Sequence, residues 1–211
     1  MRLKGRMKTL LVLAAATPLM AQSWYPRHNI HVGGGAGLPG EDLTGLFADR
    51  PSLSVGYGYR FHRNFQIDVG LDTVFGAAGI RDWLPTEWGY LRIKDYQFFL
   101  PYGGRAIIPI GGGRVLFSGG GGGTYMRYTE RIRQPSSYYT FECPVCRARD
   151  GWGYYGLLGL NVAIDGARHF WVGATTKVYR GHTEGDPLGD VPGLRTRDRW
   201  VTVFGHVGVG F

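Results

Sequence analysis

The chain has 211 residues and a formal net charge of +8, with 36 glycines and 14% aromatic residues. Glycine without a three-residue period excludes collagen, and the many aromatic residues argue against disorder. The basic residues are scattered among acidic ones rather than gathered on one face, so we expect no nucleic-acid partner.

The first 21 residues have the pattern of a secretory signal peptide. Four basic residues precede an apolar core at residues 9–20, and Ala21 is a small residue suited to cleavage. A core of about 12 residues is too short to cross a bilayer as a helix. We therefore expect residues 1–21 to be removed. Residues 22–211 would form one domain of net charge +4, because the removed segment contains no acidic residue.

Eight segments of the remaining chain show the two-residue period of β-strands. In the second segment Leu53, Val55 and Tyr57 alternate with small or polar residues, whereas glycine runs weaken the pattern in the first and fifth. Each segment is about ten to fourteen residues long, close to the length that a tilted strand needs to cross a bilayer. The expected strands are residues 28–37, 51–61, 65–76, 94–108, 114–127, 152–164, 168–180 and 199–211.

The connections between these segments alternate between long and short, as in outer-membrane barrels. The long ones are residues 38–50, 77–93, 128–151 and 181–198, and the short ones are residues 62–64, 109–113 and 165–167. Backbone groups inside hydrocarbon must all be hydrogen-bonded internally, so such a sheet must close on itself. The sequence therefore predicts an all-β fold, an eight-stranded antiparallel up-and-down transmembrane β-barrel.

The polarity of the second and third segments predicts their register. A three-residue turn at residues 62–64 would place Tyr59 opposite Ile67 and Ser54 opposite Asp72, so that apolar residues meet on one face and polar residues on the other. A soluble barrel of the lipocalin type is the structural alternative, and it would point its apolar face inward.

Charged residues on the polar faces would lie inside the barrel. Charges inside a narrow lumen require partners, and the register places Arg60 diagonal to Asp68. We interpret the set as a structural polar core, with an ion gate or narrow pore as the functional alternative. These lumen residues are Arg60, Asp68, Asp72, Arg105 and Lys177.

Two cysteines, Cys143 and Cys146, lie in the longest connection. Their spacing also occurs in half-zinc and redox motifs, but the chain has no second cysteine pair for zinc and no βαβ unit for a thioredoxin-like site. We expect a loop disulfide, because an exported protein meets an oxidising compartment.

The histidines predict no metal site and no cofactor. His28 and His31 are three residues apart on a strand and therefore point to opposite faces. His169 and His206 fall on the expected interior face, where we expect them to pack among aromatic residues.

The last strand, residues 199–211, alternates to the final residue and ends in Phe211. With the signal peptide and the strand count, this ending resembles small outer-membrane proteins of the OmpA/OmpX-like β-barrel class. The resemblance implies location in the outer membrane, four extracellular loops and periplasmic termini. It also implies recognition of Phe211 by the barrel-assembly machinery. It covers residues 22–211 and implies a structural or surface-interaction role, without enzyme activity, for a protein we expect to be monomeric.

Two alternatives remain, a porin-like narrow channel and a lipid A-modifying enzyme. Lipid A deacylases resemble this architecture and use a His-x-Ser pair, which none of the six histidines here forms. His182, Thr183 and Glu184, with Asp186 and Asp190, could imitate a hydroxyl–His–carboxylate arrangement. Arginines near the long connections could instead bind the phosphates of lipopolysaccharide, namely Arg127, Arg131, Arg133, Arg195, Arg197 and Arg199.

Overall fold

A computed structural model describes residues 25–211, apart from residues 45, 76–82, 87–88, 134–146 and 189–192. The expected signal peptide, both cysteines and Asp190 lie outside the described residues. The strands in the described part are β1 (His28–Glu41), β2 (Arg50–His62), β3 (Phe65–Phe75), β4 (Trp83–Thr86), β5 (Gly89–Ile110), β6 (Val115–Arg133), β7 (Arg147–Ala163), β8 (Phe170–Gly185) and β9 (Thr196–Gly210), with a short 3-10 turn η1 (Gly111–Gly113).

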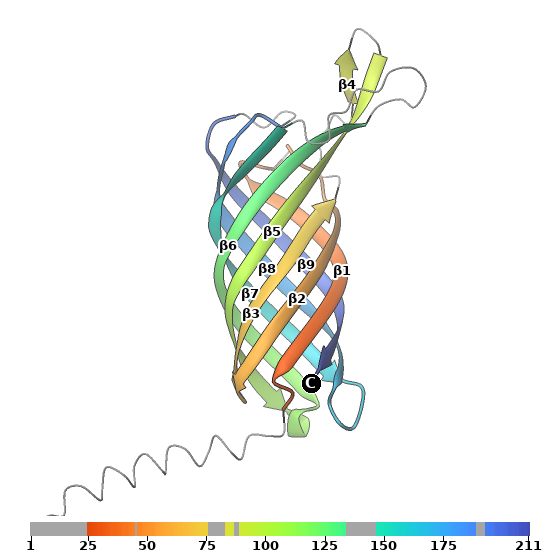
Figure 1. Cartoon of the computed structure of the whole chain (residues 1–211), viewed down its shortest axis with the longest axis vertical. Helices are drawn as coiled ribbons and strands as arrows, with labels where there is room; N and C mark the ends of the chain where they lie inside the picture. The colour runs from red at the N-terminus through yellow and green to blue at the C-terminus, as the bar shows by residue number, and fades with distance from the viewer. Residues whose placement is uncertain (1–24, 45, 76–82, 87–88, 134–146, 189–192) are drawn as a thin grey trace, which may run out of the picture.

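These strands form one closed antiparallel barrel (Figure 1). Every strand pairs with its neighbour in the chain except at β4, and β1 pairs with β9 while β3 pairs with β5. Among the described strands, β4 pairs only with the start of β5, so it extends a hairpin beyond the wall. Eight strands therefore make the barrel, as predicted. None of the described residues forms a helix long and apolar enough to cross a membrane.

The two ends of the barrel differ. At one end, which we call the short-turn end, residues 63–64, 111–114 and 164–169 join successive strands, and the first and last strands also meet there (Figure 1). The connections at the opposite end, the long-loop end, are longer. The strands continue further toward that end than predicted: β5 begins at Gly89 and β6 runs to Arg133. The prediction ended strands where the apolar alternation stopped, but backbone pairing continues without it.

The predicted register between β2 and β3 is confirmed, with Tyr59 opposite Ile67 and Ser54 opposite Asp72. The turn itself differs from the prediction. It has two residues, because His62 pairs with Phe65 and the register shifts by one between Tyr59 and His62. A bulge of this kind absorbs one extra residue, so the faces of the strands keep their predicted polarity.

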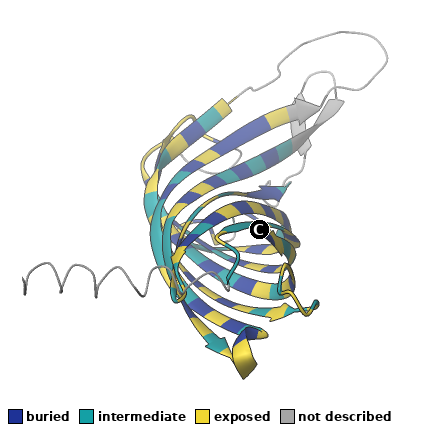
Figure 2. Cartoon of the chain, turned by 60° about the horizontal axis from the view of Figure 1, so that its bottom comes forward, coloured by how far each residue is buried: buried dark blue, intermediate teal, exposed yellow. Residues whose placement is uncertain are grey.

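Apolar side chains cover the outside of the barrel. In β2, Leu53 and Val55 are half exposed while the alternating Ser52 and Ser54 are buried. The same alternation appears as bands of burial along the wall strands wherever burial is described (Figure 2). The lipocalin-type alternative is therefore wrong, since its apolar face would point inward. The outward set contains Ile30, Val32, Tyr57, Ile67, Val69, Leu71, Leu158, Leu160, Val172, Val203, Val207 and Val209.

One glycine shows how closely the strands approach each other. A Cβ placed on Gly35 would lie 1.7 Å from the backbone oxygen of Val203 on β9, a distance that no real Cβ shows. Gly205, on the same strand pair, has open space at the corresponding position. The β1–β9 seam that closes the barrel therefore requires glycine at position 35.

Candidate functional site

The centre of the lumen holds a buried ion pair between β3 and β8. The Lys177 Nζ lies 2.8 Å and 3.0 Å from the two carboxylate oxygens of Asp72, whose side chain is fully buried. The Ser54 hydroxyl donates to the same carboxylate at 2.6 Å, and the Tyr179 hydroxyl also donates to it. Four groups thus satisfy each other across the barrel, which is what a charge in this setting requires.

A second ion pair lies nearer the short-turn end. The Arg105 Nε donates to Asp68 Oδ2 at 2.6 Å, and the Gln66 amide donates to Asp68 Oδ1 at 2.7 Å. The expected pairing of Asp68 with Arg60 is wrong. The Arg60 guanidinium lies over the Tyr25 ring, 4.5 Å from its centroid, and donates to a turn carbonyl. The bulge explains this difference, because Arg60 lies within the register shift between Tyr59 and His62 and has no partner on β3.

Between Arg60 and the central ion pair the lumen contains a cavity of about 60 Å³. Its polar lining includes Arg60, Arg105, His31, His206 and Asn161. We call it the lower cavity. A smaller cavity of about 10 Å³ lies between it and Lys177.

The long-loop half of the lumen is filled by side chains. An aromatic cluster contains Phe99, Tyr128, Tyr179 and Trp200, and each of these four side chains is completely buried. The rings of Phe99 and Tyr179 stack with centroids 4.6 Å apart, and the Trp200 Nε1 donates to the Tyr128 hydroxyl at 3.1 Å. Leu43, which follows β1, closes over this cluster.

A polar network, the rim network, lies at the same end. Its members are Arg149, Thr183, Thr196 and Asp198, all buried. Arg149 donates to the hydroxyls of Thr183 and Thr196 at 2.9 Å and 2.8 Å, and each hydroxyl donates to Asp198 at 2.6 Å. This network was not predicted from the sequence, because Arg149 and Asp198 lie outside the predicted strands. Continuing the two-residue period past residues 152 and 199 would have placed both on the interior face.

No protein-family model matches the chain, and no curated protein matches it in sequence. Solved structures match its fold. Neisserial surface protein A (NspA) aligns with a TM-score of 0.56 and 12% identity over 87% of this chain and 97% of its own. Ail, the attachment invasion locus protein of Yersinia pestis, was solved with the heparin analogue sucrose octasulfate. It aligns with a TM-score of 0.52 and 14% identity over 87% of this chain and 97% of its own. The outer membrane protein OprG of Pseudomonas aeruginosa aligns with a TM-score of 0.50 and 14% identity over 89% of this chain and 97% of its own.

The chain has the fold of small outer-membrane β-barrels. Strand number, closure, and the placement of apolar residues outside and ionic residues inside all agree with this assignment. At these identities the likeness concerns the fold, so the role of this outer-membrane-type barrel must be argued from its own residues.

The described residues of the alternative hydroxyl–His–carboxylate cluster do not converge on one site. His182 and Thr183 are neighbours on β8 and point to opposite faces, with Thr183 buried in the rim network and His182 exposed on the outside. Thr183 therefore has no hydrogen bond to His182, and its hydroxyl is held by Arg149 and Asp198. Glu184 and Asp186 are exposed.

The other histidines divide between the two faces of the wall. His28 bonds through Nδ1 to the Tyr57 hydroxyl at 2.7 Å, while His31 lines the lower cavity, so the two do not converge. His206 also lines this cavity, with its Nε2 2.6 Å from the Asn161 Oδ1. His169 is exposed in the turn before β8, so its expected interior position is wrong.

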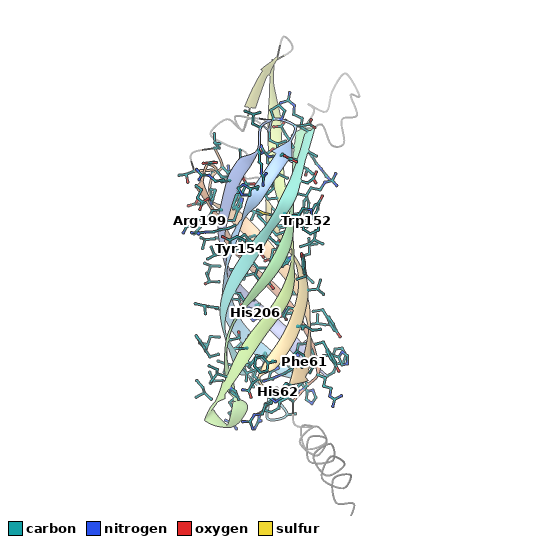
Figure 3. All side chains as sticks on the ribbon, turned by 90° about the vertical axis from the view of Figure 1, so that its left-hand side faces the viewer. Phe61, His62, Trp152, Tyr154, Arg199 and His206 are labelled. Atoms are coloured by element: carbon teal, nitrogen blue, oxygen red, sulfur yellow. The ribbon has the colours of Figure 1, made fainter. Side chains whose placement is uncertain are left out.

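The remaining predicted residues lie at the two ends of the barrel. Phe211 exchanges backbone hydrogen bonds with His28 at 2.8 Å and 2.9 Å, and its ring is 61% exposed. At the long-loop end, Arg199 and the aromatic pair Trp152 and Tyr154 are seen in Figure 3. Of the candidate arginines, the exposed ones are Arg127, Arg131, Arg195 and Arg197, and Arg199 is half-buried; the side chain of Arg133 is not described.

Proposed function

We propose that this protein is an integral outer-membrane barrel that acts as a rigid, non-conducting platform and presents its long-loop end at the cell surface. The observation that carries the proposal is the filled lumen. The rim network, the aromatic cluster and the Asp72–Lys177 pair follow one another along it. An eight-stranded barrel is just wide enough for side chains to fill.

The charge inside this lumen favours the platform over the narrow channel. Asp72 and Lys177 satisfy each other, and their carboxylate and ammonium are nearly inaccessible to water. A permeating ion would have to break this pair and displace the stacked rings of Phe99 and Tyr179. Planar-bilayer recording of the purified barrel tests this. We expect no conductance steps, whereas a barrel without either obstruction, with Asp72→Ala, Lys177→Ala and Phe99→Ala, should conduct. Steps from the unaltered protein would contradict the proposal.

The orientation follows from the proposed export of the chain and from the length of the connections. Residues 1–21 would be cleaved in the periplasm, leaving the short-turn end there and the long-loop end outside. Cysteine labelling on whole cells tests this, in a background with both native cysteines changed to serine. A membrane-impermeant maleimide should label Leu194→Cys, which is 77% exposed at the long-loop end. It should not label Arg63→Cys in a short turn. The reverse pattern would overturn the orientation.

Lipopolysaccharide is the proposed lipid partner. Arg180 and Arg199 are directly opposite each other on β8 and β9 and both face outward, with the Glu41 carboxylate 3.8 Å from Arg180. A bound anion would stabilise the positive charge that remains in this pair. Trp152 and Tyr154 lie on the neighbouring strand β7 (Figure 3), and aromatic girdles mark the membrane interface in such barrels. Lipopolysaccharide should raise the thermal stability of the barrel, and less so after Arg180→Gln. An equal rise in both proteins would exclude this contact.

The C-terminal strand is the proposed signal for the barrel-assembly machinery. The Phe211 backbone is held by β1 while its ring stays exposed on the outside. Phe211→Ala should lower the amount of folded protein in the outer membrane, with little effect on refolding of the purified chain in detergent. A matched loss in both assays would show that the ring stabilises the fold rather than directing assembly.

A further inference from the structure

The lower cavity stands out because it is lined by cationic and neutral polar groups without a carboxylate. Among the described residues that line it, Arg60 and Arg105 carry charge, and the other polar side chains include those of Asn29, His31, Gln66, Ser118, Asn161 and His206. The acid nearest in the hydrogen-bond network is Asp68, which is already bound to Arg105 and Gln66. The lining therefore carries more positive than negative charge.

Arg60 is the group in this cavity whose charge is not balanced. Only 4% of its surface is exposed, yet it forms no ion pair with any described residue. One terminal nitrogen donates to the Arg63 carbonyl at 2.6 Å, and the buried Nε has no hydrogen-bond partner in the described part of the chain. A buried guanidinium without an anion, and with an unsatisfied donor, is costly.

His31 points to the same space and is also without a hydrogen bond to another described residue. Its ring lies near that of His206, with centroids 5.6 Å apart. Two imidazoles at this separation could hold a metal ion, but Arg105 and Lys177 line the same region and would repel a cation. The described residues also contain no group of three or more metal-ligating side chains. An anion fits this environment better.

The cavity has room for a small ligand. By the same volume measure one water needs about 10–15 Å³, so a cavity of about 60 Å³ matches the few heavy atoms of one tetrahedral oxyanion. It lies at the short-turn end, close to the β2–β3 turn and to the end of β9, as its lining by Arg60 and Val209 shows. The Asp72–Lys177 pair and the aromatic cluster close the lumen above it.

We propose that the lower cavity is a binding site for a small oxyanion of the size of inorganic phosphate. Arg60 supplies the charge-assisted hydrogen bond, and His31 and His206 line the opposite part of the site. The anion would enter from the short-turn end and stop there, since the lumen is filled beyond Lys177. The site is separate from the long-loop surface on which the platform role rests.

Calorimetric titration of the folded chain in detergent tests the proposal, with sodium phosphate as the probe in a chloride buffer of constant ionic strength. We expect saturable binding. Arg60→Gln should weaken it about tenfold or more, the effect of losing a charge-assisted hydrogen bond. Arg63→Gln is the matched control: it removes the same charge from the adjacent turn, but its side chain is exposed and should leave the affinity unchanged. The heat-modifiable band on a denaturing gel reports folding.

A second variant keeps the test decisive if Arg60→Gln does not fold. His31→Leu removes a side chain that makes no hydrogen bond in the described structure, so it should fold and bind phosphate more weakly. Absence of saturable phosphate binding by the folded protein would overturn the proposal, as would equal losses in Arg60→Gln and Arg63→Gln. Binding of Zn²⁺ that depends on His31 and His206, without phosphate binding, would replace the anion by a metal.

Discussion

Removing Lys177 tests the account of the barrel interior most directly. The lysine ammonium gives the buried Asp72 its only ion pair among the described residues, at 2.8 Å and 3.0 Å. In Lys177→Met the apolar stem remains, but the carboxylate stays buried with only the hydroxyls of Ser54 and Tyr179 as donors.

The expected magnitude follows from this burial. Breaking a buried pair by removing one partner typically costs about 3–5 kcal/mol, because the other charge remains without compensation. That corresponds to a decrease of about two to almost four orders of magnitude in the folding equilibrium constant. The double variant Asp72→Asn with Lys177→Met removes both charges and keeps a polar group near the two hydroxyls. It should therefore be less destabilised than the sum of the two single variants.

Urea unfolding in lipid vesicles, followed by tryptophan fluorescence, measures these free energies. Lys94→Met is the matched control, since Lys94 is half-buried on the outward face of β5 and forms no ion pair with a described residue. It should change stability by less than about 1 kcal/mol. The reasoning that the pair holds the lumen together would be refuted if Lys177→Met lowered the free energy of unfolding by as little as the control. It would also be refuted if the loss in the double variant equalled the sum of the losses in the two single variants.

Three further predictions test other parts of the barrel. Gly35→Ala should prevent formation of the heat-modifiable folded band, because the added Cβ meets the backbone of β9, whereas Gly205→Ala should fold normally; two equal bands would contradict the close approach at this seam. The Asp165 carboxylate accepts the N–H of Phe170, at 2.9 Å, and that of His169, and these bonds lower the pKa of Asp165 below its ordinary 3.8. Because the pKa of Asp165 is lower in the folded than in the unfolded chain, its ionised form stabilises the folded state at pH values above the unfolded pKa. The urea midpoint of the wild type should therefore exceed that of Asp165→Asn at pH 7. The difference should shrink as the pH falls below 3.8, and a pH-independent difference would argue against this assignment. Leu158→Arg, on the outward face, should destabilise the barrel in vesicles by about 2–4 kcal/mol if the position lies near the bilayer midplane; an unchanged urea midpoint would mean that lipid does not surround it.

The sequence predicted the wall of the barrel well, because alternation is a local property. A two-residue period decides which side chains share a face, and this was enough to pair Tyr59 with Ile67 and Ser54 with Asp72. It also separated the outward Leu158 from the buried Lys177.

The partners inside the lumen were not predictable in the same way. Alternation gave Arg60, Asp68 and Arg105 a common face, but a bulge removed Arg60 from the ladder and left Asp68 to Arg105. The rim network joins Arg149 on β7 to Asp198 on β9 through residues of β8 and β9, and no local pattern indicates that these depths coincide.

By itself, then, the order of residues determined the number of wall strands, which side chains point outward or inward, and much of the register. Each of these depends on neighbours along the chain or across one turn. Only closure of the sheet decided which interior groups meet, because the stagger between strands sets their height along the barrel axis. That stagger places Asp72 against Lys177, 105 positions apart in the chain. It also leaves the Arg60 guanidinium facing a cavity instead of a carboxylate.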